Sequence, residues 1–351
     1  MFTPPRCPHP DCPRHLDPSP RFFYRWGHYK PRCRSFWIPR FRCRTCRRTF
    51  SRQTFRSDYR DRRPGVNCAV LEFVTSGVGL RQSGRNRALS VRGMQKKLLK
   101  IARHLGQLHD NLAAELPPRR TYALDEEETF EGVSIRPLTV PLLVETESWF
   151  LVGSAVGTIR RLARAGSRRR RLQDAEERAH GRREDQSRAR VTDVLQLLRQ
   201  RAPKGRLTIR SDEKSSYRTV IQEVFGARAT HCTTSGKDER TTANPLFPVN
   251  MTIAMSRDNC GRLRRQSWLF AKTADGLRAQ LKAYTAYRNY VRVRFNRDEP
   301  WQSAACFLGL APRALRWPEV LRWRQDWGRR SIHPISRGAR STIDSVRAAS
   351  A

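Results

Sequence analysis

An acidic segment on an apolar frame, residues 121–131, constrains the fold of this chain more than any other stretch. Tyr122, Leu124 and Phe130 occupy one alternating set of its positions and Asp125 the other, which predicts a strand with a buried face. Five of its eleven residues are carboxylates: Asp125, Glu126, Glu127, Glu128 and Glu131. A carboxylate that ends a buried strand, as Asp125 is expected to do, is a candidate metal ligand in a chain this rich in cations. A solvated acidic turn is the alternative, because runs of charge usually lie on the surface.

The net charge identifies the expected partner. The chain has 70 Lys and Arg against 32 Asp and Glu, a net charge of +38. Arg greatly outnumbers Lys, and the guanidinium group suits bidentate phosphate contacts. Charge of this size and spread favours nucleic acid over a membrane surface. A length of 351 residues allows two or three domains, and a hydrophobic fraction of 38% is enough for a core.

The expected location is the cytoplasm, in association with the nucleoid. No stretch of ~18 apolar residues is present, so no transmembrane helix is expected. The N-terminus lacks the basic and then apolar design of a signal peptide. Nine cysteines in a reducing compartment indicate metal ligands or free thiols, because disulfides are rare there.

Two close cysteine pairs, Cys7 with Cys12 and Cys43 with Cys46, predict a zinc ribbon over residues 1–58. The aromatic run between them suits a small β-hairpin layer. A domain of ~50 residues buries little apolar surface, so Zn²⁺ would supply the missing folding energy. Cations around the second pair favour DNA contact, although a purely structural cap is the alternative. Competing ligands are Cys33, His9, His15 and His28.

Residues 62–116 are expected to form a helix-turn-helix-like DNA-binding domain. Apolar residues recur at helical spacing after 66, a Gly-containing turn follows at 76–79, and Ser90 is a predicted N-cap for a basic helix. A later basic helix of this kind enters a major groove. A plain helical linker is the alternative. The candidate DNA contacts are Arg81, Gln82, Arg85, Arg92, Gln95 and Lys96.

A second acid, Asp212, ends a short apolar strand at 206–211, after a helix at 191–199. Two further buried strands follow the acidic one, at 137–145 and 149–157, which suits an antiparallel meander. Asp125 and Asp212 can converge if their strands are neighbours. Carboxylates that converge in this way hold the divalent ions of phosphodiester-cleaving sites, and Mg²⁺ or Mn²⁺ fits such oxygen ligands.

A third acid is expected from a following helix. Asp258 is the first candidate, and Asp298 and Glu299 are more remote ones. Asp258 could instead be an N-cap, a frequent role for Asp. Cations in its segment suit the phosphates of a DNA end: Arg257, Arg262, Arg264, Arg265 and Lys272.

These segments, in this order, resemble the bacterial insertion-sequence transposases of the DDE class, whose catalytic domain is ribonuclease H-like. The resemblance covers roughly residues 1–310. It rests on CPHPDC (7–12) with FRCRTCRRTFS (41–51), the basic helical segment, LDEEETFE (124–131), IRSDEKSSY (209–217) and the DN-x3-LRR segment (258–265) followed by Lys272.

The resemblance implies transposition of double-stranded DNA by metal-dependent strand cleavage and strand transfer, performed by a homo-oligomer on the element ends. It also implies that Asp125 and Asp212 are the first two members of the catalytic triad. The third member is usually Glu in this family, whereas the aligned segment offers Asp258.

The expected fold is therefore α/β and multi-domain. After the ribbon and the helix-turn-helix-like domain, residues 120–312 would form a ribonuclease H-like mixed sheet flanked by helices. Within it, residues 159–190 would be a basic insert, either a solvated helix or disordered. A basic tail would follow at 313–351, in which residues 317–328 are expected to pack and residues 329–351 to fray.

The expected function is that of a DNA transposase. The alternative is a catalytically inactive or domesticated DNA-binding regulator derived from one. The two differ only in whether three acids meet around a metal. A nuclease that cuts without joining would carry the same residues.

Overall fold

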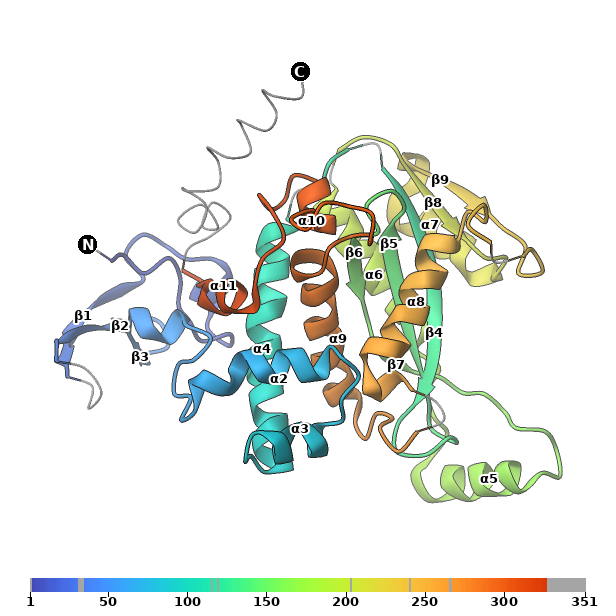
Figure 1. The fold of residues 1–351 in the computed structure, drawn as a ribbon, viewed down its shortest axis with the longest axis horizontal. Coiled ribbons are helices and arrows are strands. Elements are labelled where there is room, and N and C mark those ends of the chain that lie inside the picture. Colours follow the sequence, from blue (N-terminus) through green and yellow to red (C-terminus); the bar gives the residue numbers. More distant parts are fainter. Residues whose placement is uncertain are drawn as a thin grey trace. The chain divides into compact units, whose positions relative to one another are not determined.

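The computed structural model describes residues 2–30, 35–114, 116–118, 120–202, 204–239, 241–264 and 267–326. The chain forms two compact units, of which one combines residues 1–65 with 318–351 and the other spans residues 66–317. The protein is α/β, with a mixed sheet flanked by helices (Figure 1). Its N-terminal part contains a cluster of four cysteines.

The smaller unit is built on a three-stranded antiparallel sheet in the order β1-β2-β3. Its buried face carries Phe41 and Phe50, which pack with Phe22 and Phe55 beside the cysteines. The elements of its N-terminal part are α1 (Pro13–Leu16), β1 (Phe23–Tyr29), β2 (Ile38–Cys43), β3 (Thr49–Phe50) and the 3₁₀ helix η1 (Arg52–Phe55).

Part of the segment expected as a tail belongs to this smaller unit. The hydroxyl of Ser57 donates to the carbonyl of Leu321 at 2.7 Å, near the end of α11 (Trp317–Arg322). Trp323 is fully buried. The expectation that residues 317–328 pack is therefore confirmed for its described part. Residues 329–351, which are expected to fray, lie outside the described residues.

Three helices open the larger unit: α2 (Asn67–Val74), α3 (Leu80–Asn86) and α4 (Val91–Leu112), preceded by the 3₁₀ turn η2 (Pro64–Val66). The predicted N-cap is confirmed, because the Ser90 hydroxyl accepts from the backbone amide of Gly93 at 3.0 Å. One face of α4 is buried through Met94, Leu98 and Leu105. It packs against α9 (Ala274–Ala286), so the helical segment shares a unit with the sheet.

The large sheet has the strand order β6-β5-β4-β8-β9, and β7 also pairs with β5. The first three strands form the expected antiparallel meander, whereas β8 and β9 run parallel to β4. The acidic strand is therefore central. The bounds are β4 (Thr121–Phe130), β5 (Pro137–Glu145), β6 (Leu151–Ser154), β7 (Gly157–Thr158), β8 (Leu207–Ser211) and β9 (Ala229–Thr233).

Helices cover both faces of this sheet (Figure 1). On one face α8 (Phe247–Asn259), η4 (Gly261–Leu263) and α9 pack on apolar residues of β4, β5 and β6, with Val140, Val144 and Val249 fully buried. The opposite face carries α6 (Ser187–Arg201) and α7 (Ser215–Phe225), which is followed by η3 (Gly226–Arg228). The π-helix η5 (Tyr287–Val291) continues α9, and α10 (Ala304–Phe307) follows.

The basic insert contains a solvated helix, α5 (Arg168–His180). Two ion pairs attach it to the rest of the unit: Arg160 with Glu177 at 2.7 Å, and Arg136 with Glu176 at 2.5 Å. Of the two alternatives for this insert, the helical one is confirmed.

Candidate metal centres

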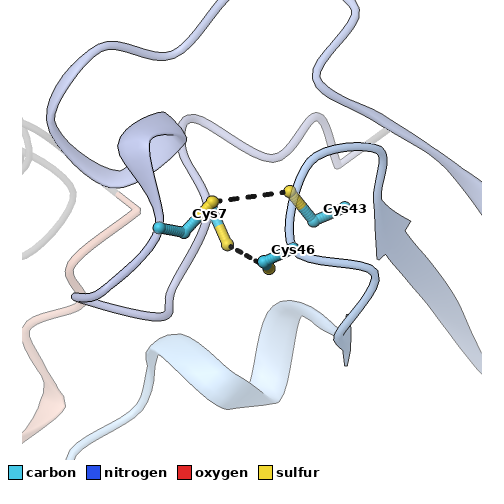
Figure 2. A group of neighbouring side chains, drawn as sticks. Cys7, Cys43 and Cys46 are labelled. Atoms are coloured by element: carbon cyan, nitrogen blue, oxygen red, sulfur yellow. Dashed lines mark hydrogen bonds between the residues drawn. The ribbon is translucent and has the colours of Figure 1, made fainter.

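Four cysteine side chains converge in the smaller unit. The Sγ atoms of Cys7, Cys12, Cys43 and Cys46 all lie within 4.8 Å of one another. The Sγ atom of Cys7 lies 3.7 Å from that of Cys46 (Figure 2). The Sγ atom of Cys12 lies 3.8 Å from that of Cys43. Zinc–sulfur bonds of ~2.3 Å in a tetrahedron place the sulfurs about 3.8 Å apart. The cluster therefore has the geometry to bind a metal such as zinc.

Two tight loops bring these thiols together. The backbone amide of Cys12 donates to the carbonyl of His9, and that of Arg47 donates to the carbonyl of Cys43. Arg47 has a φ of 58°, in the left-handed region that closes the second loop. His15 hydrogen-bonds through Nδ1 to the carbonyl of Cys7 at 2.7 Å, outside the ligand group. Of the other competing ligands, His9 and His28 also lie outside this group, and Cys33 lies outside the described residues.

The second candidate centre lies where β4 and β8 run side by side. Their register pairs Thr121 with Thr208 and Ala123 with Arg210. Two residues farther along each strand, this register reaches Asp125 and Asp212. Since side chains alternate along a strand, both aspartates then lie on the face that carries Ala123. The structure therefore brings the two predicted acids together.

Both aspartates line one cavity of about 400 Å³. It lies between the middle of β4, the end of β8, the loop after β9, and α8. Its polar lining consists of Asp125, Glu126, Asp212, Ser235, Asp238, Asn244, Asn250 and Arg257. Burial, and then the carboxylates of Glu126, Asp125 and Asp212, raise the pKa of the Tyr217 hydroxyl on α7. Of these three carboxylates, that of Glu126 accepts a hydrogen bond from the Tyr217 hydroxyl at 3.0 Å.

Backbone amides hold the two aspartates. The amide of Glu126 donates to Asp125 at 2.7 Å, and the amide of Lys214 donates to Asp212 at 3.1 Å. Each bond fixes one carboxylate oxygen. Asp212 directly follows the end of β8 as expected, whereas Asp125 lies in the middle of β4 and not at its end. The other cavity-lining acids come from β4 and from the loop after β9.

The helix side of the cavity carries an amide where an acid was expected. Asn250, Ala254 and Arg257 lie at the spacing that keeps one face of α8 toward the cavity. Asp258 is not among the lining residues; its side chain is 86% exposed and lies 3.9 Å from Arg264. It occupies the last turn of α8, so the alternative of an N-cap is wrong.

The remote candidates for the third acid also lie outside the cavity lining. Asp298 forms a two-point pair with Arg294, whose Nε lies 2.7 Å away. The hydrogen bonds from Arg294 hold the pKa of Asp298 below its usual value. Glu299 is exposed.

Glu126 also lies in the cavity lining, and its carboxylate has four partners. Thr139 and Ser187 donate to its Oε1 at 2.7 and 2.8 Å, Tyr217 donates to its Oε2 at 3.0 Å, and Lys214 pairs with it. Burial alone would raise the pKa of Glu126, but the hydrogen bond and charge of Lys214 hold it below its usual value. Glu126 is therefore an ionised residue that is already neutralised by protein groups.

Glu127 points to the other side of the strand, toward α8. It is fully buried and accepts from Ser256 at 2.8 Å and from Nε of Arg257 at 2.7 Å. The only described cation in the cavity lining, Arg257, is thus held by a buried carboxylate. Sequence reasoning missed Asn250, and it assigned Arg257 to DNA phosphates without placing it beside the two aspartates. Asn250 and Arg257 are seven residues apart, which places them on one face of α8, and this spacing was the available signal. The expected third ligand was a carboxylate, so a neutral amide was not expected.

The candidate DNA contacts lie on α3 and at the start of α4. Arg81, Gln82, Arg85, Arg92 and Lys96 are exposed and Gln95 is half-buried. In the larger unit's later part, Arg264 donates to the carbonyl of Asp258 at 3.0 Å. Lys272 lies 3.3 Å above the ring of Phe270. Arg265 lies outside the described residues.

No model of a known protein family matches this chain, and no curated protein matches it significantly. Among the described residues, no helix is both long enough and apolar enough to cross a membrane.

Proposed function

We propose that this protein is a DNA transposase: it binds the ends of a mobile element and catalyses metal-dependent strand cleavage and strand transfer. One observation carries the proposal. Asp125 and Asp212 reach the same level of two adjacent parallel strands and line one cavity, in a chain whose net charge is +38.

The lining of the cavity fits Mg²⁺ or Mn²⁺. Asp125 and Asp212 offer carboxylate oxygens and Asn250 an amide oxygen, and hard divalent ions prefer such ligands. Bound ions would activate the attacking water or hydroxyl and stabilise the leaving oxygen. Asp125 and Asp212 would hold them, and Arg257 supplies a positive charge for a DNA phosphate at the same cavity.

The architecture also supports this proposal. A mixed sheet with the acidic strand at its centre, antiparallel strands on one side and parallel strands on the other, suits a ribonuclease H-like domain. The exposed cations of α3 and α4 suit a helix-turn-helix that contacts duplex DNA. In the smaller unit, Zn²⁺ bound by the four cysteines would hold the ribbon together.

The test uses supercoiled plasmid that carries the DNA flanking the gene. The wild-type protein with Mg²⁺ or Mn²⁺ should nick this DNA and join the cut ends. Asp125→Asn and Asp212→Asn should each lower the rate by at least ~100-fold, because each removes a charged metal ligand. Glu213→Gln, a change at the exposed neighbour of Asp212, is the matched control and should leave the rate unchanged. Normal joining by Asp125→Asn would refute the proposal.

Metal binding gives a second readout that does not depend on activity. Mn²⁺ titrated into the wild-type protein should lose its free electron-paramagnetic signal, and this loss should disappear in both aspartate variants. Asn250→Asp should tighten Mn²⁺ binding, because a carboxylate replaces a neutral amide.

The amide at position 250 favours a second candidate function, a DNA-binding regulator without catalysis. One fewer negative charge in the cavity weakens the hold on a divalent ion. DNA binding by the wild-type protein, with no nicking in either metal and nicking gained by Asn250→Asp, would support that candidate.

A further inference from the structure

The outer face of the ribbon sheet exposes aromatic rings instead of burying them. Tyr24 and Trp26 of β1 form an edge-to-face pair with ring centroids 5.9 Å apart. Trp26 is 47% exposed. We call this surface, formed by Tyr24, Trp26, Arg40, Arg42 and Arg44, the aromatic–arginine face. The buried face of the same sheet is supplied by other residues, among them Phe41 and Phe50.

A β-bulge sets the position of Trp26. The pairing of β1 with β2 shifts between Arg25, which faces Phe41, and His28, which faces Pro39. Trp26 and Gly27 therefore lie opposite the single residue Arg40. Gly27 has a φ of +101°, which a residue with a side chain rarely adopts. Bulges of this kind re-aim side chains and recur next to functional sites.

Arginine side chains accompany both rings. The guanidinium carbon of Arg42 lies 4.4 Å from the ring centroid of Trp26, and that of Arg44 lies 5.2 Å from the ring of Tyr24. Side-chain hydrogen bonds fix two of the cations: Arg42 donates to the carbonyl of Arg47 at 2.8 Å, and Arg40 donates to Thr49 at 3.0 Å. Strands β1, β2 and β3 contain no Asp or Glu.

These features select one kind of partner. An apolar partner would desolvate the arginines without pairing them, which costs free energy. The phosphates of an intact duplex would pair with the arginines but give the exposed rings nothing to stack on. A single strand supplies both, because its unstacked bases present π-faces and its backbone presents phosphates.

We propose that the aromatic–arginine face binds unpaired bases of single-stranded DNA. This goes beyond the proposed transposase function and does not require the cavity of Asp125 and Asp212. Trp26 stacks on a base, while Arg40, Arg42 and Arg44 contact the phosphates on either side of it.

The test measures fluorescence anisotropy of a labelled 20-nucleotide oligodeoxythymidine and of a duplex of equal length. It uses the full chain with Asp125→Asn, so that neither DNA is cut. Base stacking on an aromatic residue contributes ~1–3 kcal/mol. Trp26→Ala should therefore weaken binding of the single strand by about tenfold and change duplex binding by less than about twofold. Trp26→Phe should retain most of the affinity.

Controls separate the outcomes. Trp301→Ala removes a tryptophan of similar exposure, 42%, from the other unit and should change neither affinity. Unchanged zinc content in Trp26→Ala shows that the ribbon is intact. Wild-type affinity of Trp26→Ala for the single strand, or an equal loss on both DNAs, would overturn the proposal. The same would hold if Trp26→Ala weakened binding of an oligouridine of equal length but not of oligodeoxythymidine, because the face would then bind RNA and not DNA. Failure of the plasmid assay, by contrast, would count against the transposase and leave this result standing.

Discussion

Removing Arg257 alone should destabilise the protein more than removing Arg257 together with its partner Glu127. The two ends of this ion pair differ in environment: the Glu127 side chain is 0% exposed and the Arg257 side chain is 39% exposed. Arg257→Ala leaves a buried carboxylate that has lost its cationic partner, although the hydrogen bond from Ser256 remains. Glu127→Ala leaves a guanidinium that can turn into water.

The magnitudes follow from this asymmetry. Breaking a buried pair so that one charge is left behind costs about 3–5 kcal/mol. Arg257 is partly exposed, and water already screens the pair, so we expect about 2–3 kcal/mol for Arg257→Ala. Adding Glu127→Ala removes the stranded charge. The double variant should therefore recover about 1–2 kcal/mol relative to Arg257→Ala.

A double-mutant cycle measured by urea unfolding tests this reasoning. Far-ultraviolet circular dichroism reports on the larger unit, which contains most of the helix. Arg170→Ala is the matched control, because its 2.8 Å pair with Asp174 is partly exposed at both ends. That variant should lose less than about 0.5 kcal/mol. A double variant that is less stable than Arg257→Ala would refute the assignment of Glu127 as a buried charge.

Two further predictions concern other parts of the chain. Cys43→Ser should lower bound zinc, measured by elemental analysis, and unfold the ribbon, whereas Cys68→Ser, outside the cluster, should change neither. Burial and then the charge of Arg201 lower the pKa of His109 to about 3, against ~6.5 in the unfolded chain. Below pH ~6.5 the unfolded state binds a proton at His109, whereas the folded state does not. The contribution of His109 to the free energy of unfolding is therefore present above pH ~6.5 and is lost as the pH falls toward about 3. The free energy of unfolding that His109 contributes should fall by about 2 kcal/mol by pH 5. Urea titrations should therefore show a smaller drop in the free energy of unfolding between pH 7 and pH 5 for His109→Gln than for the wild-type protein. Equal drops in the two proteins would contradict this.

The position of Asp212 could be predicted from the sequence because this residue directly follows a short apolar strand. Asp125 could be placed on a strand by the same kind of pattern, but the expectation that it ends that strand is wrong, because β4 continues to Phe130. Whether those strands are neighbours depends on long-range pairing, which no local pattern reveals. The cysteine cluster could be predicted because each close pair of cysteines forms its own tight loop, which is visible as a local spacing in the sequence.

The helix side of the cavity could not be predicted in this way. Asp258 stands out because it is an acid beside cations, yet α8 ends at Asn259 and leaves it in water. Which face of α8 meets the sheet is decided by Val249 and Ile253, which pack on β-strand residues far away in sequence. That packing turns Asn250 and Arg257 toward the cavity.

The use of both chain ends in the smaller unit has a consequence for biosynthesis. Its N-terminal strands are made first, but Leu321, whose carbonyl accepts from Ser57, is translated only after the entire larger unit. The smaller unit therefore cannot complete its fold until residues 318–326, which follow the larger unit, have been translated. A product truncated before residue 318 would keep all four clustered cysteines and still lack part of the unit that they belong to. Zinc content alone would therefore not distinguish a protein that includes residues 318–326 from a product that ends before residue 318.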